Sequence, residues 1–149
     1  MKKCDITSAE FFNRLAVVYG DDAPAQQERY SELAERFENE FNEIENIRFF
    51  SAPGRTEVGG NHTDHQRGRV LAGAVNLDTR AAVRVNGSDT IRILSKGYPM
   101  SEVDITNLQP VEAEINSTPA LIRGVAARFT QLGCKVEGFD AYCESTVLP

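Results

Sequence analysis

The chain has 149 residues, of which 41% are hydrophobic and 26% charged, and its 16 basic and 22 acidic side chains give a formal net charge of −6. This length suits a single domain, and no apolar run approaches the roughly 18 residues of a membrane span. The acidic balance disfavours nucleic-acid binding, and three widely spaced cysteines favour a reducing cytoplasm over a disulfide framework. We therefore expect a cytoplasmic domain without membrane or nucleic-acid partners.

The charge is concentrated in the first third of the chain. Residues 1–46 hold 5 basic and 11 acidic side chains, a net charge of −6, whereas residues 47–149 hold 11 of each. Glutamates between regularly spaced apolar residues are typical of the solvated face of surface helices. We expect residues 1–46 to form an acidic helical segment packed on the domain, although an acidic partner-binding face stays open as an alternative.

Two helices are predicted in this acidic segment. Thr7 or Ser8 can cap the first, which ends near Gly20, and Pro24 suits the first turn of the second. The predicted core positions recur every three or four residues, at Phe11, Leu15 and Val18 in the first helix and at Tyr30, Leu33, Phe37, Phe41 and Ile44 in the second.

The remainder of the chain predicts strands with one further helix. Short β-type runs occupy residues 47–52, 69–75, 79–85, 90–94, 101–105 and 136–146. Pro53-Gly54 should end the first run, and Asn86-Gly87 should join the third and fourth as a hairpin. Thr118-Pro119 opens a helix closed by Gly133, with apolar positions at Leu121, Ile122, Val125, Phe129 and Leu132. Strands flanked by helices predict the α+β class.

The most informative stretch, residues 52–68, is a polar segment between two predicted strands. Its seventeen residues hold four glycines and both histidines of the chain. Asn61, His62 and Asp64 offer donors and acceptors suited to a hydroxylated ligand, and the forked guanidinium of Arg55 suits a phosphate or a carboxylate. A glycine-rich structural loop whose polar groups cap one another is the alternative.

Three other interpretations of this stretch fit poorly. A phosphate loop needs Lys-Ser/Thr where Gly60-Asn61 follows Gly54-x4-Gly59. The run His62-x-Asp64-His65 resembles a set of metal ligands, but two histidines without a nearby cysteine do not complete a closed site, so we expect no metal site. The Gly-x-Ser-x-Gly elbow of serine hydrolases is absent from the sequence.

The stretch resembles the signature of a known family. Pro53-Gly54-Arg55 followed by Gly60-Asn61-His62-Thr63-Asp64-His65 is similar to Gly-Arg-x-Asn-Leu-Ile-Gly-Glu-His-Thr-Asp-Tyr of the galactokinases, which are GHMP kinases. The resemblance extends from about Phe49 to the end, through Gln66-Arg-Gly-Arg-Val-Leu, Leu121-Ile-Arg-Gly-Val and the run that begins at Gly138.

The resemblance implies a fold and a reaction. The fold would be a mixed sheet with flanking helices of the ribosomal S5 domain 2 type, with residues 47–149 as a GHMP kinase N-terminal domain truncated before its phosphate loop. The parent enzyme would phosphorylate the anomeric hydroxyl of galactose with ATP, while Mg²⁺ bridges the phosphates. The phosphate loop and the catalytic aspartate would lie beyond Pro149, so the fragment alone should be inactive and could self-associate through uncovered apolar surface.

The resemblance also implies roles for individual residues. Arg55 aligns with a catalytic arginine near the transferred phosphate, and it also borders the sugar. His62 and Asp64 align with residues that hydrogen-bond the sugar hydroxyls, and Asn61 stands where the family usually has a sugar-binding glutamate. Ser95 matches a serine near the adenine. Two alternatives stay open, namely a sugar-sensing binding protein without catalysis and a GHMP kinase for another sugar.

Overall fold

The strands form one five-stranded sheet in the order β1-β2-β5-β3-β4. The computed structural model describes residues 6–60 and 63–147. Its elements are α1 (Ala9–Tyr19), α2 (Ala23–Phe41), β1 (Arg48–Gly59), β2 (Leu71–Val85), β3 (Thr90–Ser95), β4 (Ser101–Asp104), α3 (Thr118–Gln131) and β5 (Phe139–Ser145), with three short 3₁₀ turns. Because β3 and β5 are parallel and the other pairs antiparallel, the predicted mixed α+β sheet is confirmed.

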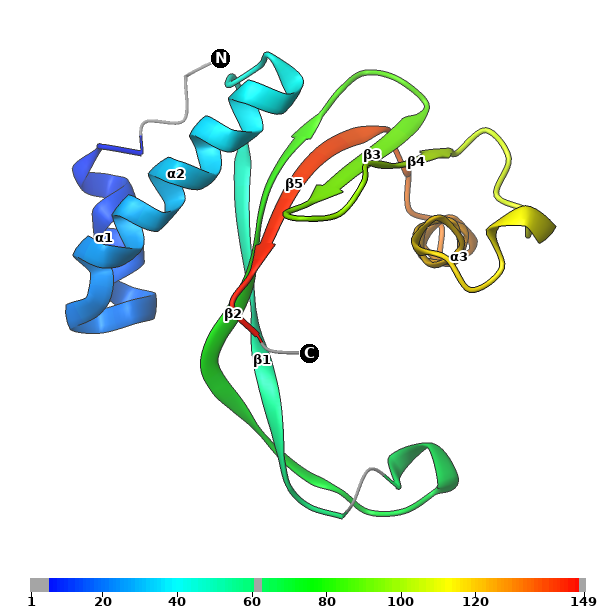
Figure 1. The fold of residues 1–149 in the computed structure, drawn as a ribbon, viewed down its shortest axis with the longest axis horizontal. Coiled ribbons are helices and arrows are strands. Elements are labelled where there is room, and N and C mark those ends of the chain that lie inside the picture. The colour runs from blue at the N-terminus through cyan, green and yellow to red at the C-terminus, as the bar shows by residue number, and fades with distance from the viewer. Residues whose placement is uncertain (1–5, 61–62, 148–149) are drawn as a thin grey trace.

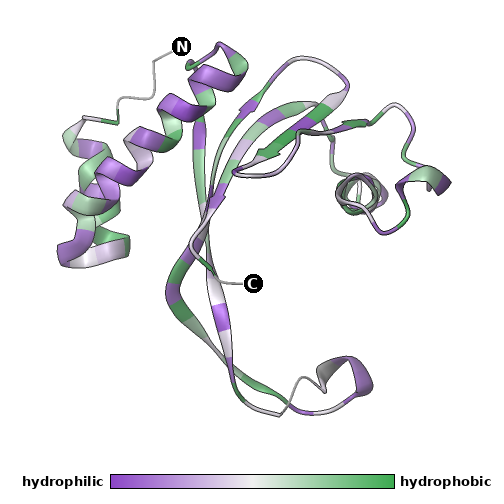
Figure 2. Ribbon diagram, viewed as in Figure 1, coloured by the Kyte–Doolittle hydropathy of each residue, from purple (hydrophilic) through white to green (hydrophobic). Residues whose placement is uncertain are grey.

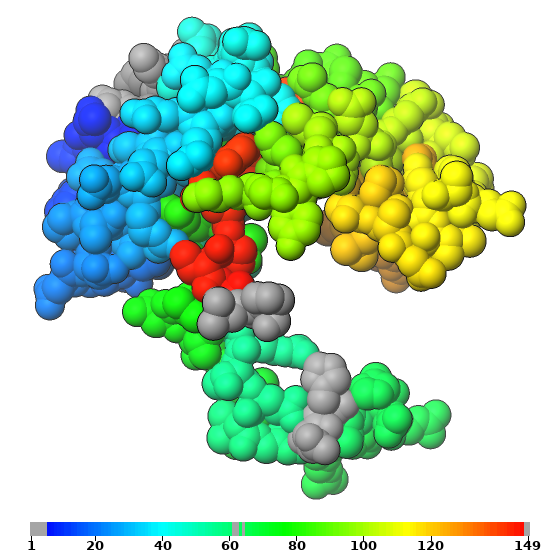
Figure 3. All heavy atoms as spheres, in the orientation of Figure 1, coloured from blue at the N-terminus to red at the C-terminus, as the bar shows by residue number. Residues whose placement is uncertain are grey.

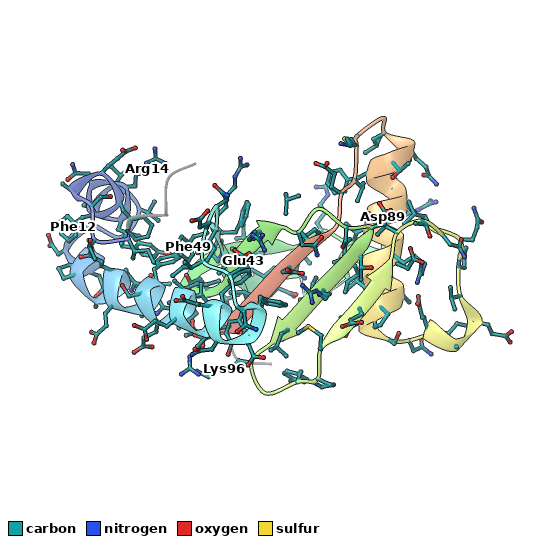
Figure 4. The ribbon with its side chains drawn as sticks, turned by 90° about the horizontal axis from the view of Figure 1, so that it is seen from above. Phe12, Arg14, Glu43, Phe49, Asp89 and Lys96 are labelled. Carbon is teal, nitrogen blue, oxygen red and sulfur yellow. The ribbon has the colours of Figure 1, made fainter. Side chains whose placement is uncertain are left out.

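The helices lie on opposite sides of this sheet. Helices α1 and α2 cover one face, and α3 lies on the other side beside β4 (Figures 1 and 4). Strands β1 and β2 run on beyond both layers as a two-stranded ribbon that ends in residues 60–70 (Figure 1). The sheet therefore has a helix-covered end and a projecting end.

The helix pair forms because its ends are capped and one face is apolar. The Ser8 hydroxyl accepts a hydrogen bond from the Phe11 amide at 3.2 Å, and Pro24 lies in the first turn of α2, as predicted. The core between the helices and the sheet contains Leu15, Ala23, Tyr30, Leu33, Phe37, Ile47, Ala82 and Tyr142. Phe49 extends this core from β1 towards the helices (Figure 4). One predicted core position was wrong, since Val18 is 69% exposed. Ile44 packs against the core as predicted, but it lies beyond the end of α2.

Charged side chains are also buried under the helices. Arg80 and Glu144 are cross-strand neighbours on β2 and β5, both are buried, and the Nη2 of Arg80 donates to a Glu144 carboxylate oxygen at 3.1 Å. Arg36 of α2 and Lys96 approach the other carboxylate oxygen at 3.2 and 3.3 Å. A buried carboxylate needs such compensation, so this cluster helps to hold α2 against the sheet.

The prediction that Pro53-Gly54 ends the first strand was wrong. β1 continues to Gly59, because β2 bulges at this point: Pro53 pairs with Asp78, but Arg55 pairs with Ala74. A proline is tolerated in a strand at an edge or a bulge, and β1 is an edge strand. The same bulge explains why the predicted strands 69–75 and 79–85 are one strand, β2.

The predicted hairpin at Asn86-Gly87 was also wrong. β5 lies between β2 and β3, pairing with β2 antiparallel and with β3 parallel, so the strands on either side of the turn do not pair. The Asn86 side chain instead donates to the buried carboxylate of Asp140 at 2.7 Å. A local turn signal cannot reveal a strand that arrives from fifty residues away and inserts between its neighbours.

Helix α3 packs through a different face from the predicted one. Its apolar positions Leu121, Val125 and Phe129 are 69%, 50% and 51% exposed, whereas Arg123 and Ala126 are buried. The Arg123 guanidinium donates to both carboxylate oxygens of Glu114, at 2.6 and 2.8 Å, and to the Asp104 carbonyl at 2.8 Å. This arginine therefore fixes α3 to β4, and the apolar stripe stays exposed in the described structure.

Hydrophobic residues also recur along the ribbon beyond the helices (Figure 2). They include Val58, Val70, Leu71 and Leu77, all exposed. Among the described residues, no helix combines the length and the apolar character that crossing a membrane requires.

Replacing Glu144 with glutamine should destabilise the fold by about 3 kcal/mol, because Arg80 would stay buried without its counter-charge. Urea denaturation measures this free energy of unfolding. Glu137→Gln is the matched control, since Glu137 pairs with Lys135 at the exposed surface, and it should change little. Equal effects of the two substitutions would contradict the buried-charge interpretation.

Candidate functional site

The projecting end of the sheet carries the signature residues. Arg55 lies on the outer half of β1, opposite Ala74 of β2, and its side chain is exposed. Beyond Gly59 the described part of the turn consists of Gly60 and residues 63–70, and β2 begins at Leu71. The space-filling view shows this end standing clear of the helix-covered body (Figure 3). The signature is therefore displayed at an accessible tip rather than buried in the core.

Thr63 organises the turn at this tip. Its hydroxyl donates to the Gly60 carbonyl at 2.7 Å. Its own carbonyl accepts from the amides of Gln66 and Gly68, at 3.0 and 2.8 Å. One residue thus joins the incoming and outgoing halves of the loop, and the short 3₁₀ turn Asp64–Gln66 follows directly from it.

Two glycines allow the halves of the loop to approach closely. Gly60 has φ of +109°, and a Cβ there would lie 2.6 Å from the Cα of Val70. A Cβ at Gly68 would overlap the side chain of Thr63. Because side chains rarely adopt such a φ and cannot occupy these positions, the loop depends on glycine at both ends.

The predicted site residues have different positions in this structure. Arg55 lies on the ribbon, and Asp64 begins the 3₁₀ turn at its tip. Asn61 and His62 lie outside the described residues. Ser95 ends β3, which is separated from β1 by β2 and β5, so the structure does not bring Ser95 to the ribbon.

The described residues do not form a site for a divalent cation. Within residues 6–60 and 63–147, no three His, Cys, Asp or Glu side chains gather as metal ligands do. Hard cations such as Mg²⁺ need several oxygen ligands, commonly carboxylates and phosphates. We assign no chemical step to a metal ion in the described residues.

A polar network at the base of the ribbon was missed by the sequence analysis. Asp78 of β2 is 7% exposed, and its Oδ1 accepts from Arg29 at 2.8 Å. Its Oδ2 accepts from Ser51 of β1 at 2.8 Å and from Tyr19 of α1 at 3.2 Å. The sequence does place Asp78, Arg80 and Ala82 at every second position, on one face of β2. That spacing did not predict their burial, because charged residues on a strand usually face solvent.

Burial and hydrogen bonds shift the pKa values of two groups in this network, Asp78 and Tyr30. Burial raises the pKa of the Asp78 carboxyl, but hydrogen bonds from Arg29 and Ser51 outweigh it, so the pKa lies below its ordinary value. Burial and the hydrogen bond with Tyr19 both raise the pKa of Tyr30. The hydroxyls of Tyr19 and Tyr30 lie 3.0 Å apart. Tyr30 can donate to Tyr19 while Tyr19 donates to the Asp78 carboxylate.

Comparison with known proteins finds a family signature in this part of the chain. Residues 35–85 match the family model of the galactokinase galactose-binding signature. The chain is 33% identical to the galactokinase of Bacillus subtilis over 111 residues, which cover 73% of this chain and 28% of that protein. It is 34% identical to the galactokinase of Streptococcus thermophilus over 116 residues, which cover 75% of this chain and 29% of that protein. The chain thus spans less than a third of these relatives.

Solved structures share the fold. The galactokinase of Lactococcus lactis, solved in complex with galactose, superposes with a TM-score of 0.69 at 21% identity, covering 80% of this chain and 31% of that one. The mevalonate kinase of Methanococcus jannaschii superposes with a TM-score of 0.54 at 11% identity, and the match covers 71% of this chain and 34% of that one. The expected GHMP kinase type of fold is confirmed.

Gly60→Ala should open the loop at the tip, because the new methyl group would collide with Val70 and strain a positive φ. Trypsin cleavage after Arg67 and Arg69 measures this, and we expect it to become several-fold faster at unchanged melting temperature. Gly59→Ala is the control, since a Cβ there meets nothing within 4 Å. Equal cleavage rates in the two variants would show that the loop does not depend on Gly60.

Proposed function

We propose that this chain, which matches the galactokinase galactose-binding signature and aligns with part of the galactokinases, supplies the sugar-binding half of a kinase that phosphorylates galactose. One observation carries the proposal, namely the galactose-binding signature at residues 35–85. Its most polar part occupies a loop closed by Thr63 at an exposed tip. A loop held by a rigid sheet is where binding residues are usually displayed.

The proposed reaction gives galactose 1-phosphate and ADP from galactose and ATP. The anomeric oxygen forms a bond to the γ-phosphorus, the bond from that phosphorus to the ADP oxygen breaks, and the hydroxyl proton passes to a base. Because the chain spans less than a third of its galactokinase relatives, our proposal assigns Mg²⁺, the base and most contacts to ATP to other residues. The use of ATP, together with the free thiols of Cys134 and Cys143, favours a cytoplasmic location.

In this proposal the ribbon contributes the sugar side of the reaction. The carboxylate of Asp64 accepts hydrogen bonds from two sugar hydroxyls, and His62 and Asn61 complete the set. Arg55 borders the sugar and stabilises the negative charge of the transferring phosphoryl group. The exposed position of Arg55 on β1 supports this role, because a second domain could reach its guanidinium. Ser95, away from the ribbon, stays a weak candidate for nucleotide contact.

Galactose should bind this chain weakly, in the millimolar range, because only one side of the site is present. Saturation-transfer NMR detects such binding. Asp64→Asn should abolish the signal, since an amide accepts fewer hydroxyl bonds than a carboxylate. Asp89→Asn is the matched control, because Asp89 is exposed at the far end of the sheet (Figure 4), and it should bind as the unaltered chain does.

The same experiment separates the proposal from its alternatives. Stronger binding of glucose or another sugar would favour a related kinase with a different preference, for which Asn61 gives a reason. No binding of any hexose would contradict the sugar-binding role. Galactose-dependent release of ADP by these 149 residues alone would overturn the assignment of the chemistry to other residues. The alternative of a sugar sensor predicts that a longer protein containing this chain binds galactose but does not phosphorylate it.

The expected self-association also stays a prediction. The exposed stripe Leu121, Val125 and Phe129 on α3 supports it, because contiguous apolar surface drives association. Light scattering should show dimers whose share rises with concentration, and the double substitution Leu121→Gln/Phe129→Gln should return the chain to a monomer. Val17→Gln on α1 is the control, since Val17 is even more exposed, at 87%, but lies across the sheet. A monomer at all concentrations would refute this expectation.

A further inference from the structure

The ribbon is least supported at its base. β5 ends at Ser145, which pairs with Thr79, so from Asp78 outward β2 has only β1 as a neighbour. The register between β1 and β2 then shifts. Between the pairs Pro53–Asp78 and Arg55–Ala74, β1 has one residue, Gly54, whereas β2 has three. A bulge bends a strand and increases its twist. The direction of the ribbon is therefore set at Asp78.

The Asp78 side chain connects this point to the helices. It accepts hydrogen bonds from Tyr19 at the end of α1, from Arg29 of α2 and from Ser51 of β1. These donors come from three elements and converge on one buried carboxylate. Since charge-assisted hydrogen bonds are the stronger kind, the carboxylate ties both strands of the ribbon base to the helix pair.

The Asp78 backbone connects the same point to the end of β5. The Asp78 amide donates to the Thr146 hydroxyl at 3.1 Å, and the Asp78 carbonyl accepts from that hydroxyl at 3.1 Å or from the Thr146 amide at 3.0 Å. Val147 packs into the bulge, because a Cβ on Gly54 would lie 2.9 Å from its Cγ2. The chain leaving β5 is thus held against the base of the ribbon.

We propose that Asp78 is a positioning residue that fixes the angle of the sugar-binding ribbon and couples it to the segment that follows β5. The proposal rests on the proposed function, because it concerns how the sugar loop is placed. Asp78 lies at the base of the ribbon, seven residues after β2 leaves the loop at Leu71, and takes no part in the chemistry. It acts by preventing the two-stranded ribbon from swinging at its bulge.

The alternative is that Asp78 is only one of several buried charges that stabilise the fold. The Arg80–Glu144 cluster provides a comparison within the same face of the sheet, because it is equally buried but lies inside the three-stranded part. Loss of Glu144 should therefore weaken the whole fold evenly. Loss of the Asp78 carboxylate should release the ribbon specifically, because β1 and β2 pair with no third strand beyond Thr79.

Hydrogen–deuterium exchange on the full 149-residue chain distinguishes these roles. In Asp78→Asn and in Tyr19→Phe, backbone amides of residues 54–59 and 71–77 should exchange at least five-fold faster relative to those of residues 80–85. Thr146→Val should loosen the same ribbon amides, because it removes the hydroxyl bond to Asp78. In the control Glu144→Gln the two groups of amides should keep their ratio. An unchanged ratio in Asp78→Asn would overturn the inference.

Galactose binding then tests the consequence for the site. Asp78→Asn should weaken galactose binding about five- to ten-fold, and Asp78→Glu, which keeps the carboxylate, should recover part of the affinity. A looser ribbon with unchanged affinity would overturn the positioning role. If the unaltered chain binds no galactose, the proposed function fails, whereas the exchange ratio still decides whether Asp78 holds the ribbon.

Discussion

The buried carboxylate of Asp78 is the interaction on which the arrangement of this molecule depends. A charge removed from water must be compensated, and here the compensation comes from α1, α2 and β1 together, through Tyr19, Arg29 and Ser51. The same residue is the first of β2 to pair with β1 after the register between the two strands shifts. One buried anion thus joins the helix pair to the sheet at the point where the ribbon leaves it.

This arrangement divides the chain into a rigid base and a displayed loop. The base obtains its stability from an apolar core and from buried ion pairs under the helices. The loop has no such core and is shaped instead by Thr63 and by glycines that permit close approach. Figure 1 shows the tip of the ribbon and α3 on the same side of the sheet. A sugar bound at the tip, as proposed, would therefore be accessible from this side of the sheet.

Local patterns in the sequence predicted much of this, and contacts between distant residues account for the failures. The cap at Ser8 and the core positions Leu33 and Phe37 follow from helical periodicity, and the signature predicted the loop because its motif is contiguous. The insertion of β5 beside β2 and the burial of Arg123 were not predictable, since both depend on partners far along the chain. Asp78 belongs to the same class, because nothing adjacent in sequence indicates that three donors would cover it.

The most direct test of the account is an amide NMR titration of this chain with galactose. The account predicts that resonances of residues 53–60 and 63–70 shift with a common saturation curve. It also predicts that the amides of α1, α2 and α3 stay unchanged. Shifts confined to the hollow of about 890 Å³ between α1, α2 and the base of the ribbon, or the absence of any shift, would contradict a sugar site at the tip.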